Sequence, residues 1–554
     1  MKKKVFALLI IMCMMLTSCT DNNTKENAVE KENAMKYAST TPYGKYPKLI
    51  TYSLGKMTGV NNSNMPEGDT YENNAYTRYL REKLNIQNED VFEVEENGNY
   101  NETVSMAISS DNMPDIMAVK DYDTLQMLVE NDMIEDLTDS YKTCMSDRIR
   151  KIYESYGDKL LGDVTFKGRI MALPGTNIED GPNFIWLRKD WLDKLHLKEP
   201  KTIDDICNIV RKFIEKNPGN SYEKIGMVCS GDIVSDSGGQ YQMDTIFAAF
   251  NAFPKRWIRG TSGKVVYGSV EPQVKEALGK IRSMYKEGII DKDFILRGDN
   301  NIADLIINGK CGAFFGPWWS SNNPLMVARH EDPEAEWMPY LVNTDGDGNI
   351  SYAEQKPNGY YIVVRKGYEH PEIAAKIISV LFDDFKYGKD EISQYYQLNV
   401  DPTARPLAIN VDYSNSLLKC YKSLCDIFDR KASVMDLKLL EESYYKSCKR
   451  YRESDDTTIE DWAVYTSRIT ACSLMDNAKK NKVESVFYGE TPSMRDNWWK
   501  LQKMEKKAFL AIITGDKPLS YFDTFVKEWY DKGGREITKE VRIQVNIREK
   551  NRTK

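Results

Sequence analysis

The sequence lacks most features that mark a metalloenzyme, a nucleic-acid-binding protein or a membrane-spanning protein. It has only 3 histidines in 554 residues and no Cys-x-x-Cys pair, so a zinc site is not expected. Its net charge is −7 and its basic residues form no stripe, which argues against nucleic acid as a partner. After the first 18 residues, no apolar run reaches the roughly 20 residues that a membrane helix needs.

The first residues have the pattern of an export signal. Residues 1–18 contain three lysines, a short apolar run and then small residues. The end of this segment, Leu16–Cys19 (LTSC), resembles the lipobox of bacterial lipoproteins. The resemblance implies cleavage before Cys19 and acylation of its thiol, which would anchor the protein by lipid at the outer face of a Gram-positive cell membrane. An ordinary cleaved signal is the alternative, and residues 19–45 are polar enough to predict a flexible tether.

The remaining cysteines predict buried free thiols rather than disulfides. Cys13 belongs to the signal and Cys19 to the lipidation site, so neither is available for pairing in the folded chain. The others are scattered and lie mostly in apolar segments: Cys144, Cys207, Cys229, Cys311, Cys420, Cys425, Cys448 and Cys472.

The order of the expected elements predicts an α/β fold with a helical C-terminal part. Strands and helices alternate from Lys48 to Leu137, which is typical of βαβ units around a parallel sheet. Thr165–Pro174 predicts a hairpin, and Phe184–Leu195 predicts a strand that turns into a helix capped by Asp190. In that turn, Arg188 is expected to pair with Asp190. From Pro371 onward the chain predicts helices, including Met494–Ile513.

The stretch Gly309–Pro324 (GKCGAFFGPWWSSNNP) is the most informative segment for a binding site. Small residues and two phenylalanines bounded by Gly and Pro predict a short buried strand. Trp318 and Trp319 follow directly, at the strand end where ligands of α/β sheets bind. Two interpretations stay open: the rings form a stacking platform for a sugar, or they fill the core.

Five further residues are candidates for ligand contact because they fall at expected strand ends or loops. Asp115 offers two acceptor oxygens for sugar hydroxyls, with a turn cap as the alternative. Asn183 and Trp186 flank the strand that begins at residue 184, and Trp186 could equally be a core residue. Trp257 follows a proline turn, and Tyr360 lies in an NGYY segment.

Four segments together resemble one known family. They are Thr165–Pro174 (TFKGRIMALP), Phe184–Leu195 (FIWLRKDWLDKL), Gly309–Trp319 (GKCGAFFGPWW) and Ile513–Val541. Each is similar to signatures of extracellular solute-binding proteins of family 1, the sugar-binding proteins of ABC importers, in their long LplA-like lipoprotein subgroup. The similarity follows the same order along essentially the whole mature chain.

The resemblance implies a two-lobed fold of the periplasmic-binding-protein type II class, with ligand held in a cleft between the lobes. It places residues 46–164 and 301–366 in lobe 1, and residues 165–300 and 367–545 in lobe 2 with the helical C-terminal part. The implied function is capture of an oligosaccharide and its delivery, through hinge closure, to the permease subunits of an ABC transporter. A monomer anchored through Cys19 with no required cofactor is expected.

Two other functions stay open at this point. An exported carbohydrate-active enzyme would need a pair of carboxylates at catalytic separation, and no segment singles out such a pair. A binding module for peptides or for other anionic solutes is the second. A peptide receptor would need a charged clamp for the peptide termini, and the sequence identifies none.

One segment has the pattern of a calcium loop. In Asn343–Glu354 (NTDGDGNISYAE), Asn343, Asp345, Asp347 and Glu354 occupy ligand positions of an EF-hand loop, although the first is Asn rather than Asp. The alternative is the turn of a hairpin running to Val364, because Asp-Gly pairs also favour tight turns. Several relatives carry a calcium loop where this chain has Lys216–Gly226 (KNPGNSYEKIG), which contains no Asp.

Overall fold

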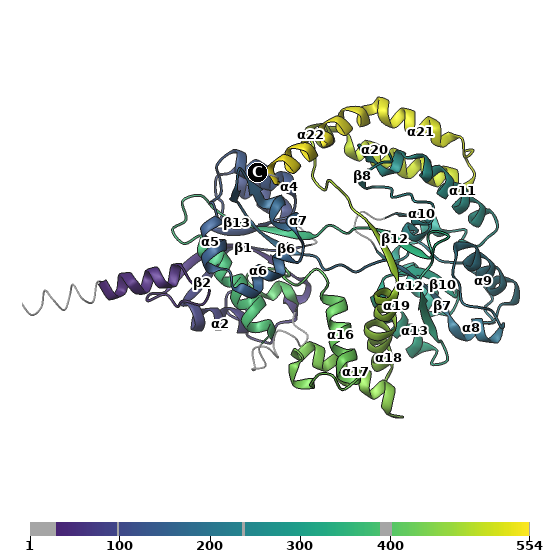
Figure 1. Ribbon diagram of the computed structural model, residues 1–554, viewed down its shortest axis with the longest axis horizontal. Helices are drawn as coiled ribbons and strands as arrows, with labels where there is room; N and C mark the ends of the chain where they lie inside the picture. Colours follow the sequence, from purple (N-terminus) through teal and green to yellow (C-terminus); the bar gives the residue numbers. More distant parts are fainter. Residues whose placement is uncertain (1–28, 97–98, 235–238, 388–400, 553–554) are drawn as a thin grey trace, which may run out of the picture. The chain divides into compact units, whose positions relative to one another are not determined.

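The structure is a computed structural model that describes residues 29–96, 99–234, 239–387 and 401–552. The chain divides into two compact units, each made of helices and sheet (Figure 1). Unit 1 contains residues up to Thr176 together with Asn358–Asp412, and unit 2 contains Asn177–Pro357 and Tyr413–Lys554. The α/β class with two lobes and a helical C-terminal part is therefore confirmed.

Unit 1 is built on a five-stranded sheet in the order β2-β1-β3-β13-β6. The strands β1 and β3 run parallel to each other and β2 runs parallel to β1, whereas β13 is antiparallel to β3 and β6. The central strands are rich in apolar residues, as expected for strands covered on both faces. In β3 (IMAV) all four residues are buried. The strands are β1 (Ile50–Thr58), β2 (Ile86–Glu95), β3 (Ile116–Val119), β6 (Leu173–Thr176) and β13 (Asn358–Val364).

Helices follow the strands of unit 1 as the alternation predicts. Asn74 caps α2 through its side-chain oxygen and forms a capping box with Thr77, which fixes where the helix begins. The helices are α2 (Ala75–Leu84), α3 (Tyr100–Ser109), α4 (Tyr122–Glu130), α5 (Thr138–Cys144), α6 (Asp147–Glu154), α7 (Asp158–Val164) and α14 (Glu372–Ser379). The predicted hairpin is present as β4 (Thr165–Phe166) and β5 (Arg169–Ile170).

The predicted tether is wrong for its second half, because residues 29–39 form a helix that belongs to unit 1. The ammonium of Lys376, itself fully buried, donates to the carbonyls of Ala38 and Thr41 at 2.7 Å and of Gly44 at 2.9 Å. A cation at carbonyls that have no helical partner stabilises this chain reversal. Tyr46 adds a 2.6 Å hydrogen bond to Glu372, so the segment is fastened at two points.

Unit 2 contains a three-stranded antiparallel sheet with β7 in its centre, between β10 and β11. The predicted strand–helix turn is confirmed as β7 followed by α8, but Asp190 does not cap the helix. Its carboxylate instead accepts two 2.7 Å hydrogen bonds from Arg188, the pairing that the sequence predicts. The strands are β7 (Phe184–Arg188), β8 (Trp257–Arg259), β9 (Val265–Tyr267), β10 (Ala313–Gly316), β11 (Trp337–Tyr340), β12 (Asn349–Ala353) and β14 (Lys479–Val483).

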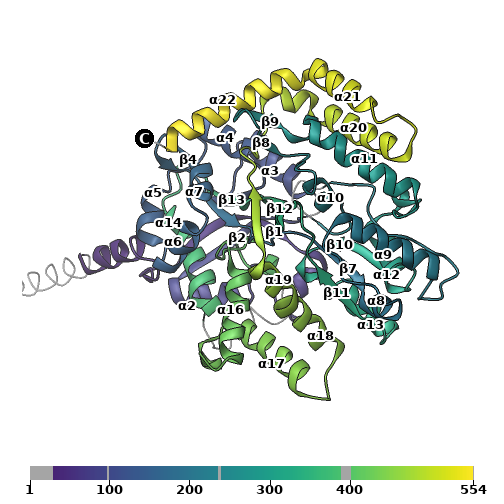
Figure 2. The ribbon, with the colours of Figure 1, turned by 45° about the vertical axis from the view of Figure 1, so that its right-hand side comes forward.

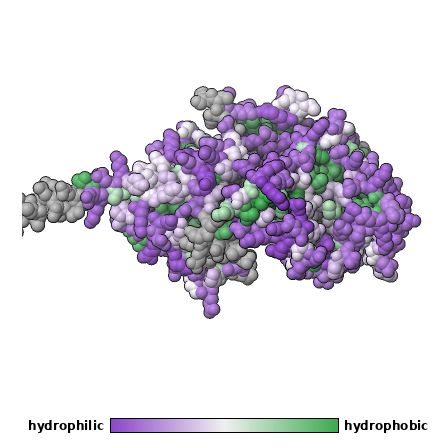
Figure 3. Space-filling model, turned by 60° about the horizontal axis from the view of Figure 1, so that its bottom comes forward, coloured by the Kyte–Doolittle hydropathy of each residue, from purple (hydrophilic) through white to green (hydrophobic). Residues whose placement is uncertain are grey.

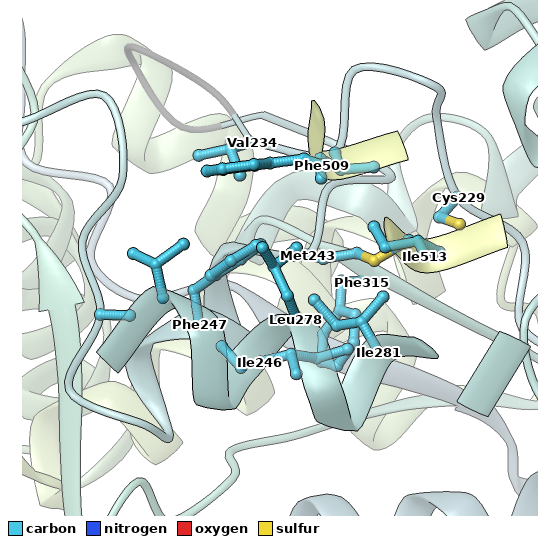
Figure 4. Packing of buried hydrophobic residues seen from close by; sticks show 14 of the residues in the cluster. Cys229, Val234, Met243, Ile246, Phe247, Leu278, Ile281, Phe315, Phe509 and Ile513 are labelled. Atoms are coloured by element: carbon cyan, nitrogen blue, oxygen red, sulfur yellow. The ribbon is translucent and has the colours of Figure 1, made fainter. Parts of the chain in front are cut away.

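The helices of unit 2 enclose its largest hydrophobic core. Helix α20 packs against α11, α21 and α22, and α21 and α22 follow one another along the outside of the unit (Figures 1 and 2). Side chains from α10, α11, α20 and β10 meet in this core, among them Phe247, Leu278, Phe315 and Phe509 (Figure 4). The helices are α8 (Lys189–Lys194), α9 (Ile203–Lys216), α10 (Asp244–Ala248), α11 (Pro272–Lys286), α12 (Asp299–Ile307), α13 (Leu325–Glu331), α16 (Ser416–Phe428), α17 (Leu439–Glu453), α18 (Ile459–Tyr465), α19 (Cys472–Asn477), α20 (Pro492–Thr514), α21 (Tyr521–Trp529) and α22 (Arg535–Arg552).

The observed units correct the expected domain boundaries. Residues 301–357 belong to unit 2, because β10 and β11 both pair with β7. Residues 367–412 belong to unit 1, where α14 packs against α5. The expected hairpin over 343–364 is also wrong: β12 pairs with β14, whereas β13 joins the sheet of unit 1.

The sequence predicted buried free thiols and no membrane-spanning helix after the signal. The cysteines that the structure describes are free thiols, and all but Cys425 are buried, as predicted. Across the ranges given above, no helix has the length and apolar character needed to cross a membrane. The face in Figure 3 is mostly hydrophilic. The signal and Cys19 lie outside the described residues.

Candidate functional site

Trp318 and Trp319 lie on a short 3-10 turn, Trp318–Ser321, directly after β10. This turn is fastened to its surroundings: Ser320 accepts a 3.0 Å hydrogen bond from Gln240, and Ser321 donates a 2.8 Å hydrogen bond to the carbonyl of Ala463. Gly316 is needed before the turn, since a Cβ there would lie 2.4 Å from the hydroxyl oxygen of Ser320. The turn therefore holds both indoles in fixed positions.

Trp318 is the centre of a polar cluster rather than an open platform. Its side chain is buried, and its indole N–H donates a 3.0 Å hydrogen bond to a carboxylate oxygen of Asp180. The guanidinium of Arg468 lies over its ring, 4.5 Å from the centroid. We call Trp318, Asp180, Gln355, Arg468 and Tyr444 the Trp318 cluster. Trp319 is partly buried and packs against the hydrophobic cluster that contains Trp318.

Asp180 links the cluster to the neighbouring loop. Its backbone N–H donates to the Gln355 side chain at 3.3 Å, and the amide of Gln355 lies 3.5 Å from its second carboxylate oxygen. Burial raises the pKa of the Asp180 carboxyl, while the hydrogen bonds from Trp318 and Gln355 and the charge of Arg468 act in the opposite direction. A desolvated carboxylate held in this way is a typical acceptor for ligand hydroxyl groups.

A pocket of about 50 Å³ opens next to Asp180, within unit 2. It is lined by polar and apolar side chains together, including Asn183, Thr245, Phe253, Tyr352 and Gln355. By the same measure one water needs about 10–15 Å³, so the pocket has room for a few waters or for one sugar substituent. Gln355 lines the pocket and accepts a hydrogen bond from the backbone of Asp180, so it is the member of the Trp318 cluster that borders this pocket.

The other candidates of unit 2 have different surroundings. Asn183 lines the pocket, although its amide already donates to the carbonyl of Gly239 at 2.9 Å. Trp186 is fully buried and donates to the carbonyls of Gly316 and Pro317, which makes it a support beneath the turn. Trp257 is also buried, stacked on Trp498 at a centroid distance of 6.2 Å. Of these three residues, Asn183 is the one that lines the pocket described above.

Two candidates lie in unit 1. Both carboxylate oxygens of Asp115 are engaged, one by the backbone N–H of Ser53 at 2.9 Å and one by Arg365 at 2.6 Å. Asp115 therefore links residues of neighbouring strand segments, a role that differs from the turn cap named as the alternative in the sequence. Tyr360 is partly buried and donates a 3.0 Å hydrogen bond to Glu96.

The calcium ligand set does not fit a metal site. Asp345 accepts hydrogen bonds from the backbone of Asp347 and Asn349 and from the Asn349 side chain, so it stabilises the turn itself. Glu354 is buried and forms an ion pair with Lys482 at 3.3 Å. The backbone N–H of Asn343 donates a 2.9 Å hydrogen bond to the backbone carbonyl of Lys201. Among the described residues, no group of three or more His, Cys, Asp or Glu side chains could hold a metal ion.

We therefore expect calcium to leave the stability of the protein unchanged. Addition of Ca²⁺ or of EDTA should give the same melting temperature within error, because Asp345 and Glu354 are used by protein groups. Asp345→Ala should lower the melting temperature equally with and without Ca²⁺. A rise with Ca²⁺ that Asp345→Ala abolishes would contradict this interpretation.

Four residues of the Trp318 cluster were not predicted from the sequence. Asp180 comes from the loop before β7, Gln355 follows β12, Tyr444 lies on α17, and Arg468 lies in a π-helical segment (Thr466–Ala471). Only Asp180 carries a local signal, because it precedes the Gly181-Pro182 turn next to the predicted strand. Arg468 comes to the tryptophan only through the tertiary packing of the helical part.

Comparison with known proteins agrees with this architecture. Residues 62–384 match the family of bacterial extracellular solute-binding proteins. The chain is 21% identical to the polygalacturonan/rhamnogalacturonan-binding protein YtcQ of Bacillus subtilis, over 64% of this chain and 66% of that protein. It is 24% identical to the fructooligosaccharide ABC transporter substrate-binding protein FusA of Streptococcus pneumoniae, over 53% of this chain and 57% of that protein. A solved extracellular solute-binding protein from Bifidobacterium longum subsp. infantis shares the fold, with a TM-score of 0.62 and 15% identity over 92% of this chain and 99% of that chain.

The two-unit α/β fold is shared with the solved solute-binding protein from Bifidobacterium longum subsp. infantis. Because the family match spans more than half of the chain, the protein belongs to the bacterial extracellular solute-binding proteins. This is a family of binding proteins rather than of enzymes. The chain spans less than two thirds of the length of the curated relatives named above.

Proposed function

We propose that the protein is an extracellular receptor that captures an oligosaccharide and delivers it to the permease of an ABC importer. The observation that carries the proposal is the family match over residues 62–384, together with two relatives that are named for saccharide ligands. The Trp318 cluster supports it, because an indole beside a desolvated carboxylate and an amide suits a ligand with hydroxyl groups.

Attachment to the outer face of the membrane through Cys19 is part of the proposal. The LTSC segment, Leu16–Cys19, supports lipidation at this cysteine. Radiolabelled palmitate should be incorporated into the full-length protein expressed in a Gram-positive host, and Cys19→Ser should abolish the incorporation. Label on the Ser variant would refute lipidation at this position.

A thermal-shift screen tests the ligand class. The soluble chain starting at Thr20 is mixed with oligosaccharides, with peptides and with buffer alone. A ligand at a hundred times its dissociation constant stabilises the fold by about 2.7 kcal/mol, which gives a clear shift of the melting temperature. We expect a shift with one class of saccharide. A shift with peptides only would refute saccharide capture.

A further inference from the structure

The guanidinium of Arg468 lies over two aromatic rings. Its guanidinium carbon lies 4.5 Å from the centroid of Trp318 and 4.1 Å from that of Tyr444. One of its terminal nitrogens donates a 2.8 Å hydrogen bond to the Tyr444 hydroxyl. Stacking on two rings fixes the plane of a guanidinium while leaving the N–H groups along its edge available.

No carboxylate lies within ion-pair distance of Arg468 in the described part of the chain, although its charge lowers the pKa of the Asp180 carboxyl. Its hydrogen bond to Tyr444 is the only one that it forms there, and it makes no ion pair there. Arginines of the same unit behave differently: Arg450 binds both oxygens of Asp461, and Arg188 binds both oxygens of Asp190. Arg450 and Arg188 are thus each hydrogen-bonded to a carboxylate, whereas Arg468 is not hydrogen-bonded to a carboxylate among the described residues.

The remaining N–H groups of Arg468 are accessible to solvent. Among the described side chains, several polar atoms are buried without a hydrogen-bond partner, but no nitrogen of Arg468 is one of them. A guanidinium with free N–H groups in a fixed plane is suited to a planar carboxylate, which it binds through two parallel hydrogen bonds.

We propose that Arg468 makes the site selective for saccharides that carry carboxylates, namely uronic acid units, over neutral saccharides. This inference rests on the proposed function. Asp180 contacts the indole nitrogen of Trp318 and Arg468 covers the face of the same ring. Asp180 accepts hydroxyl hydrogens and Arg468 binds a carboxylate, so the two charged groups on one tryptophan match the two kinds of group on a uronic acid.

Isothermal titration calorimetry with matched ligands tests the selectivity. The probes are trimers of galacturonate, mannuronate and guluronate, each beside its neutral methyl ester, and a panel of neutral oligosaccharides. Wild-type protein should bind at least one acid form about tenfold or more tightly than its ester. Arg468→Gln should remove the preference while ester binding remains. The matched control is Arg329→Gln, which removes another arginine stacked on a tryptophan of this unit, Trp462 at 4.7 Å, and should keep the preference.

The outcomes separate the two claims. Binding of neutral saccharides without any preference for an acid form would overturn the role of Arg468 and leave the proposed function standing. Absence of binding to every saccharide would overturn both. Should Arg468→Gln fail to fold, the wild-type salt dependence decides: between about 0.05 and 0.5 M NaCl, affinity for the acid should fall and affinity for the ester should not. Equal salt dependence of both forms would overturn the inference.

Discussion

Trp318→Ala should weaken saccharide binding by about 30-fold or more, the largest loss expected from a single substitution. Trp318 holds the Asp180 carboxylate through its indole N–H and supports the guanidinium of Arg468 on its ring, so the substitution removes the centre of the cluster. Truncation of an aromatic residue at the centre of a binding site typically costs about 2 kcal/mol or more, which corresponds to this loss. Calorimetric titration with the saccharide identified by thermal shift measures it.

The matched control is Trp499→Ala. Trp499 lies on α20 in the same unit with 59% of its surface exposed, so its replacement should change neither folding nor affinity.

Because Trp318 is only 6% exposed, its removal should also cost about 3–5 kcal/mol of stability. Asp180→Asn keeps the shape of the cluster and should weaken binding with a smaller loss of stability. Unchanged affinity in both Trp318→Ala and Asp180→Asn would exclude the cluster as the binding site.

Lys376→Met should release the N-terminal segment from unit 1 and lower the free energy of unfolding by about 2–4 kcal/mol. The side chain of methionine fills a similar volume, but the carbonyls of Ala38, Thr41 and Gly44 lose their shared donor. Hydrogen–deuterium exchange should then accelerate over residues 29–46, with a smaller change in the sheet. Urea unfolding followed by circular dichroism measures the loss of stability.

Lys45→Met is the control for this prediction. Lys45 lies in the same segment but is exposed, so its loss should leave both exchange and unfolding unchanged. Equal hydrogen–deuterium exchange over residues 29–46 in Lys376→Met and wild-type protein would contradict this prediction. It would show that the Tyr46–Glu372 hydrogen bond alone is enough to keep the segment bound to unit 1.

Local patterns predicted many elements because their residues carry the signal themselves. The apolar run and acidic turn of Phe184–Leu195 form the predicted strand and helix, and Thr202 caps α9 through a capping box with Asp205. The lysine-rich strand β14 was missed because it has no apolar alternation and pairs with β12 through backbone contacts. Gly533-Gly534 has the pattern of a helix end, yet the chain resumes as helix α22 after a single positive φ of 127° at Gly533.

Long-range pairing explains the parts of the fold that the sequence did not reveal. The expected boundaries put residues 301–357 in the wrong unit, because antiparallel pairing of β10 and β11 with β7 leaves no local trace. The charged residues around Trp318 were also not predictable, because they are distant from it in the chain. The GPWW segment pointed to Trp318, but its partner Asp180 is 138 residues away in the chain, and Arg468 lies in a helical region without a motif. Residue type identified the aromatic group, and only the fold identified its charged neighbours.

The measurement that tests the account most directly is hydrogen–deuterium exchange of the soluble chain with and without the saccharide that gives the largest thermal shift. Capture at the Trp318 cluster predicts slower exchange in the three segments that surround it: residues 178–183, 316–321 and 466–470. Protection in these segments, absent with Trp318→Ala, would support saccharide capture at this site. Saccharide binding that leaves all three segments unprotected would contradict it.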